Sequence, residues 1–126
     1  MKKGWLGIGI LAAFLVLGLL VSSWMDRVHL PVEQLLQEAA EAAMEGDLEE
    51  GIVLAREAES LWSSSRKKTA AVADHSPMEE IDSLFQELWI YGAAEEAPHF
   101  AATSAALAYR VRAMADAHRL CWESLL

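Results

Sequence analysis

Residues 31–62, PVEQLLQEAAEAAMEGDLEEGIVLAREAESLW, predict two helices joined by a short turn. Apolar side chains recur at helical spacing on both sides of the turn, and glutamates such as Glu33 lie off the apolar stripe of the first helix. Gly46 ends the first helix, and Asp47 suits the N-cap of the second, with Glu50 three residues on as a capping box. The stretch therefore predicts an antiparallel helix hairpin.

A second hairpin is predicted by a similar pattern further along the chain. Residues 76–79, SPME, combine a cap, a proline at the first helical position and a glutamate at the third. Gly92 is expected to end that helix as a left-handed cap, and a last helix begins near residue 95. Residues 46–50 align with residues 92–96, so the two hairpins form a weak internal repeat. Tetratricopeptide repeats are also helix hairpins in series, but their residue signature is missing here. The apolar stripes of the first and third helices carry Leu35, Leu36, Ala39, Ala42, Ala43, Ile81, Leu84, Phe85, Leu88 and Trp89. The second helix runs through Leu48, Ile52, Ala55, Glu59 and Trp62. The candidate core positions of the last helix are Phe100, Leu107, Val111, Met114, His118 and Trp122.

Ahead of the first hairpin lies an uncharged stretch from Gly4 to Met25, preceded by Lys2 and Lys3. About 20 apolar residues cross a bilayer as a helix, so this stretch predicts a transmembrane anchor that contacts lipid. Trp5 and Trp24 near its ends suit the membrane interfaces. The alternative is a cleaved signal peptide, although the apolar run exceeds the usual length of about 7–15 residues.

The lysine pair before the span sets the expected orientation. The positive-inside rule places the N-terminus in the cytoplasm and the rest of the chain outside it. The predicted organisation is a cytoplasmic stub and anchor at 1–25, a juxtamembrane link at 26–30, and an extracytoplasmic domain at 31–126 whose first helix begins at Pro31. The fold class is all-α: a transmembrane helix followed by a small four-helix domain of two antiparallel hairpins.

Composition excludes several classes of function. The 126 residues carry a net charge of −9, which disfavours nucleic acid because phosphate contacts need clustered lysine and arginine. Cys121 is the single cysteine, so neither an intramolecular disulfide nor a multi-cysteine zinc site is possible; the thiol is either buried or joins two copies. No catalytic motif supplies an acid, a base or a nucleophile, so we expect no enzyme and no cofactor.

The order of features resembles a family of short single-span proteins from spore-forming Gram-positive bacteria, catalogued as domain of unknown function 4363. The resemblance covers nearly the whole chain. It is carried by Trp62, the basic residues 66–68, the pair Asp74 and His75, residues 80–81, and the closing residues 123–126. A second tryptophan that often follows the basic residues is missing, and an asparagine usual near the C-terminus is replaced by serine. The family has no assigned activity, so the resemblance implies a setting at the cell envelope and no mechanism.

Two groups of residues are candidate sites. Asp74, His75 and Glu79 provide an imidazole and carboxylates that could hold a divalent ion, although a helix cap with acids in its first turn explains the same residues. Trp62 beside Arg66, Lys67 and Lys68 places an aromatic next to cations on an acidic chain, which suits an acidic partner or a cell-wall polyanion. The simpler explanations are core packing for the tryptophan and salt bridges for the cations.

These features predict a non-catalytic, single-pass membrane protein at the cell envelope, acting in protein interaction, self-association or assembly. The alternative is an extracytoplasmic small-ligand or divalent-metal sensor built on Asp74 and His75.

Overall fold

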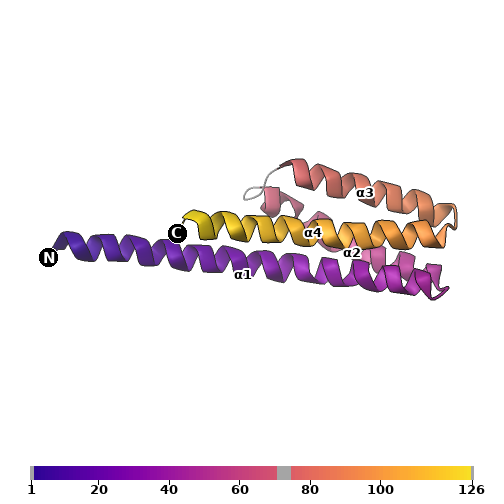
Figure 1. Cartoon of the computed structure of the whole chain (residues 1–126), viewed down its shortest axis with the longest axis horizontal. Helices are drawn as coiled ribbons and strands as arrows, with labels where there is room; N and C mark the ends of the chain where they lie inside the picture. Colours follow the sequence, from indigo (N-terminus) through magenta and orange to yellow (C-terminus); the bar gives the residue numbers. More distant parts are fainter. Residues whose placement is uncertain (1, 71–74, 126) are drawn as a thin grey trace.

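The chain folds into a bundle of long helices, shown in Figure 1. The computed structural model describes the backbone of residues 2–70 and 75–125, and the side chains of residues 4–20, 23, 24, 27–68 and 77–117. These residues form four α-helices and no strand, so the all-α prediction is confirmed for the described part of the chain. The helices are α1 (Lys2–Met44), α2 (Leu48–Ala70), α3 (His75–Ala93) and α4 (Ala97–Leu125).

The first helix differs from the sequence prediction. The expected link at 26–30 and the expected helix start at Pro31 are wrong, because α1 runs through both as one helix of 43 residues with Pro31 inside it. Proline cannot donate the backbone hydrogen bond to the carbonyl of Arg27, which destabilises a helix interior. His29 and Val32 flank the exposed Pro31 and are buried, and their packing offsets that loss.

The two predicted hairpins are confirmed and close into one bundle. Figure 1 shows α1 running antiparallel to α4, with α2 beside them and α3 on the far side of α4. The contacts are most extensive between α1 and α4 and between α1 and α2, intermediate between α3 and α4, and smallest between α2 and α3. The hairpins therefore pack mainly through their α1–α4 faces.

The core follows the predicted helical periodicity. Trp62, Phe100 and Leu36 are among the largest side chains that are fully buried. Glu33, predicted to face solvent, is buried instead, and Leu35 is half-buried. His118 and Trp122 lie outside the residues whose side chains are described. The other buried core residues include Val32, Ala39, Ala43, Ala55, Ala58, Met78, Ile81, Phe85, Leu88, Leu107, Val111 and Met114.

The internal repeat is clearer in the structure than in the sequence, and its register differs from the predicted one. The left-handed residues of the two turns are Gly46 and Glu95, 49 positions apart, so Gly46 does not correspond to Gly92. At this spacing the buried positions 29, 32, 36, 39 and 43 of α1 match 78, 81, 85, 88 and 92 of α3. Positions 51, 55, 58, 62 and 65 of α2 likewise match 100, 104, 107, 111 and 114 of α4. Residues 28–68 and 77–117 are therefore two copies of one structural unit.

The turns close by the same backbone hydrogen bonds. The N–H groups of Asp47 and Glu96 donate to the carbonyls of Ala42 and Tyr91, at 2.9 and 3.0 Å. Each bond spans five residues across a left-handed residue, as in a Schellman motif. Asp47 is confirmed as the N-cap of α2, because its Oδ1 accepts the N–H of Glu50 at 3.1 Å.

Gly92, predicted as the cap of α3, lies inside that helix and is buried. The left-handed position is taken by Glu95, with a φ of 56°. The prediction was wrong because position 92 packs against Ile52 of α2 and Phe100 of α4, which keeps the glycine inside the helix.

Taken over the described residues alone, none of the helices is long and apolar enough to cross a membrane.

Two helical glycines provide a matched test of the packing. A β-carbon at Gly51 would lie 2.9 Å from the carbonyl oxygen of Ala39 and 3.2 Å from a ring carbon of Phe100, whereas at Gly92 the nearest atoms are 3.5 Å away. Overpacking costs about 1–3 kcal/mol, so Gly51→Ala should lower the free energy of unfolding even though alanine favours a helix. Gly92→Ala should raise it by about 0.5–1 kcal/mol. Urea unfolding of the full chain in detergent micelles, followed by circular dichroism, measures both, and equal effects would contradict the close approach of α1 and α2.

Candidate functional site

The N-terminal part of α1 is the most unusual surface of the molecule. Figure 1 shows it projecting past the ends of the other three helices. Its large apolar side chains from Trp5 to Leu20 have exposed fractions between 43% and 76%. The consecutive residues 14–17 are all exposed, and four consecutive positions cover every face of a helix. This segment is apolar all round, which is typical of helices surrounded by protein or lipid.

The two tryptophans predicted to flank the anchor have different surroundings. Trp5 is 76% exposed near the free end of α1. Trp24 is half-buried, and its ring lies edge-on to that of His29, with the ring centroids 6.5 Å apart. His29 in turn lies 5.8 Å from the ring of Trp62. Trp24 therefore belongs to an aromatic cluster at the end of the bundle where the projecting segment begins.

Trp62 does not form the exposed aromatic surface that the sequence suggested. Its ring is buried, and its Nε1–H donates to Oδ1 of Asp82 on α3 at 2.8 Å. The other oxygen of Asp82 accepts from Nε of Arg66 at 2.9 Å and lies 2.8 Å from Nη2 of the same side chain. One carboxylate thus joins α2 to α3 through two residues that had been assigned to a docking site.

Lys67 and Lys68 remain exposed on α2. Because α2 runs antiparallel to α1, they lie at the end of the bundle from which the apolar part of α1 projects. Of the four proposed partner-binding residues, only these two are free of structural contacts among the described side chains.

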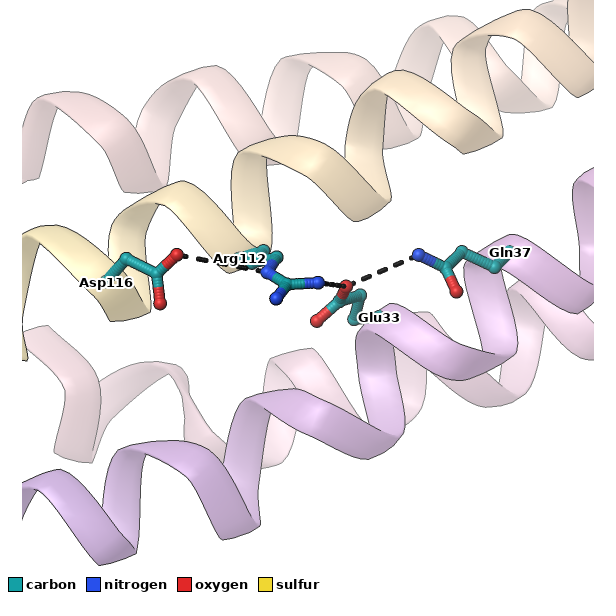
Figure 2. A network of polar contacts seen from close by, with 4 residues as sticks. All are labelled: Glu33, Gln37, Arg112 and Asp116. Atoms are coloured by element: carbon teal, nitrogen blue, oxygen red, sulfur yellow. Dashed lines mark hydrogen bonds and ion pairs between the residues drawn. The ribbon is translucent and has the colours of Figure 1, made fainter.

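A second carboxylate joins the hairpins at the equivalent place. Glu33 of α1 corresponds to Asp82 in the repeat, and its Oε1 accepts from Nη1 of Arg112 on α4 at 3.3 Å. Figure 2 shows Arg112 between Glu33 and Asp116, with Gln37 reaching the same oxygen of Glu33 from the next turn of α1. In each hairpin the first helix therefore presents an acid to an arginine from the second helix of the other hairpin.

Sequence reasoning missed this pair of contacts, because it placed Glu33 off the apolar stripe and assigned no role between helices to Asp82. The signal that could have found them is the spacing of 49 residues between the two acids. That spacing is visible only when the repeat is aligned in its structural register.

The seam between α2 and α3 holds further polar contacts. Nε1–H of Trp89 donates to Oε2 of Glu59 at 2.8 Å, and the guanidinium of Arg56 lies over the Trp89 ring, 5.1 Å from its centroid. In the α1–α4 seam, by contrast, the buried hydroxyl of Ser104 donates to the carbonyl of Leu36 at 2.6 Å. The interface between α2 and α3 is thus held by indole–carboxylate hydrogen bonds. The more extensive interface between α1 and α4 is held mainly by apolar packing.

The turn of the second hairpin carries a small polar group. Tyr91 stacks on His99 with ring centroids 5.1 Å apart, and Nδ1 of His99 lies 3.3 Å from Oε2 of Glu96. The nearby charge of Glu87 raises the pKa of Tyr91, and Glu96 adds to the effect. These residues connect the end of α3 with the start of α4.

The metal-binding prediction is not tested. Asp74 and the side chains of His75 and Cys121 lie outside the described residues, and Glu79 is exposed. Among the described side chains, no group of three or more histidine, cysteine, aspartate and glutamate residues could hold a metal ion.

A shallow groove lies between α1 and α2 where the projecting segment meets the bundle. Its volume is about 260 Å³. Arg27 lines it from α1 and Lys68 from α2, with Trp24, Val28, Pro31 and Leu61 among the apolar walls. Ser64 and Ser65 complete the lining, so the groove combines two cations and two serines with apolar surface.

Comparison with known proteins adds no family. No family model, no curated protein and no solved structure matches the chain. The resemblance to domain of unknown function 4363 stays a prediction.

The Asp82 contacts give a second testable prediction. Asp82→Ala leaves the buried indole N–H of Trp62 without its acceptor and Arg66 without its partner, so the free energy of unfolding should fall by about 2 kcal/mol. Asp116→Ala is the matched control, because Asp116 is exposed and lies 3.9 Å from Arg112, and it should change stability by less than about 0.5 kcal/mol. Urea unfolding measures both variants, and equal stability of the two would refute a structural role for Asp82.

Proposed function

We propose that the protein is a non-catalytic, single-pass membrane-anchored helical module that presents its bundle to protein partners at the cell envelope, on the extracytoplasmic side of the membrane. The observation that carries the proposal is the all-round exposure of the apolar side chains from Trp5 to Leu20. The described part of the bundle buries none of these large apolar side chains, so lipid is the environment that best accounts for them.

The length of the uncharged stretch supports the same proposal. The residues from Gly4 to Met25 carry no charge, and all of them belong to α1. At a rise of about 1.5 Å per residue they extend for roughly 33 Å, against a hydrocarbon layer of about 30 Å. Lys2 and Lys3 before this stretch favour a cytoplasmic N-terminus, which puts the bundle outside.

The interaction role is supported by a difference between the two repeats. Ile90 and Tyr109 are exposed by 67% and 69%, and the equivalent positions of the first repeat hold Glu41 and Ser60. Positions 41 and 60 are exposed in the first repeat as 90 and 109 are in the second, and they hold polar residues. The fold therefore does not require an apolar residue at position 90 or 109. These two side chains are therefore available to a partner.

The anchor is tested by placing charge in the projecting segment. Leu11→Arg with Leu15→Arg should remove the chain from membranes, because each arginine at the centre of a span costs about 2.5–3.5 kcal/mol. The control is Val53→Arg with Ile90→Arg, two exposed apolar positions on the bundle. After an alkaline carbonate wash of cell membranes, we expect the parent chain and the control in the pellet and the Leu11 and Leu15 variant outside it. Release of the parent chain by carbonate would overturn the anchor.

The interaction role is tested by photo-crosslinking in intact cells. A photoactivatable amino acid at position 90 or 109 should give a discrete crosslink to a protein or to a second copy of the chain. Positions 41 and 60 are matched controls, because they have the same exposed setting in the other repeat. Equal crosslinking at all four positions would show that the apolar pair does not mark an interface.

A further inference from the structure

We propose that the groove between α1 and α2 binds the anionic phosphate of a phospholipid head group. The proposal rests on the membrane anchor proposed above and assigns a ligand to residues next to it. It also gives Lys68 a different partner from the acidic protein suggested by the sequence.

The cations of the groove are available for a ligand. Arg27 and Lys68 are both exposed, and neither forms an ion pair with a carboxylate among the described side chains. The one hydrogen bond recorded for the Arg27 side chain is from Nη2 to the hydroxyl of Ser23, at 3.1 Å, so most of its five N–H donors stay free. By contrast, Arg66, Arg110 and Arg112 are each paired with an acid. The chain as a whole is acidic, so it is the local pairing of two unpaired cations at one groove that forms a site for an anion.

The level of the groove along α1 matches the head-group layer. Arg27 lies two residues beyond Met25 and Pro31 lies six beyond, so at about 1.5 Å per residue they stand roughly 3 and 9 Å outside the apolar run. The polar layer of a bilayer is about 5–8 Å thick on each side. The antiparallel course of α2 brings Lys68 back to the same level, where it lines the groove with Trp24. Phosphates of the adjacent leaflet therefore lie within reach of both cations.

The apolar walls favour a lipid over free phosphate. Val28, Pro31 and Leu61 line the groove beside the cations. An inorganic ion buries no apolar surface against such walls, whereas the glycerol carbons of a lipid do. An acidic protein would also meet the cations, but it would have to enter the head-group layer to reach them.

The test is lipid binding by the full chain in detergent micelles, read by native mass spectrometry. Dioleoyl-phosphatidylglycerol should bind as one molecule per chain, and Arg27→Gln with Lys68→Gln should weaken binding at least about tenfold, because two charge-assisted contacts are lost. The control is Lys67→Gln with Arg110→Gln, which makes the same change in charge at exposed residues that do not line the groove. The control should bind like the parent chain, and all three proteins should unfold at similar urea concentrations.

Each other outcome has a defined meaning. Equal weakening in the two double variants would reduce the effect to net charge and overturn the proposal. If inorganic phosphate displaces the lipid at equal concentration, the groove is a site for free anions. If a glutamate-rich peptide binds through Arg27 and Lys68 and the lipid does not, the groove is a site for an acidic protein.

The carbonate wash separates this proposal from the anchor. If the parent chain stays in the pellet but the chain shows no lipid selectivity, only the groove assignment is contradicted. Release of the parent chain contradicts the anchor.

Discussion

The structure depends on the packing of one stripe of α1, formed by His29, Val32, Leu36, Ala39 and Ala43, against α2 and α4. Because α1 contacts the helix that follows it and the last helix of the chain, it joins both hairpins into one core. The small residues of the stripe let α2 approach until a β-carbon at Gly51 would meet the backbone of Ala39. The same helix continues through Pro31 into the projecting apolar segment, so the bundle is attached to that segment without a flexible joint.

The repeat explains how a chain of this length closes a bundle. Each hairpin buries the same five positions on each of its helices, and an acid of its first helix meets an arginine of the other hairpin. The two seams nevertheless differ. Apolar packing, the Ser104 hydrogen bond and the Glu33–Arg112 ion pair hold α1 against α4. Trp62 and Trp89, by contrast, donate to carboxylates between α2 and α3. These hydrogen bonds fix how α2 and α3 lie against each other, although the two helices make little apolar contact. They do so because a buried indole N–H without an acceptor costs free energy.

Much of the fold was predictable because helices have strong local signals. Periodic apolar positions identified the buried residues Leu36, Ile81 and Val111, and Asp47 marked a true N-cap. The failures share one physical cause. Pro31 was taken as a helix start, Gly92 as a helix end and Glu33 as a surface residue, and in each case contacts with another helix override the local preference. For the candidate site, the apolar run was visible in the sequence, but the burial of Trp62 and the groove at Arg27 depend on which helices meet.

The sequence by itself determined the all-α class, the two hairpins, the uncharged N-terminal stretch and most of the core, because periodicity, caps and charge are properties of neighbouring residues. Only the tertiary structure decided that α1 is a single helix, that the repeat spans 49 residues, and that Asp82 joins Trp62 to Arg66. It also decided that Arg27 and Lys68, 41 positions apart in the chain, face one groove. These features arise where residues distant in sequence compete for the same buried space or the same carboxylate, and no local pattern records the outcome of that competition.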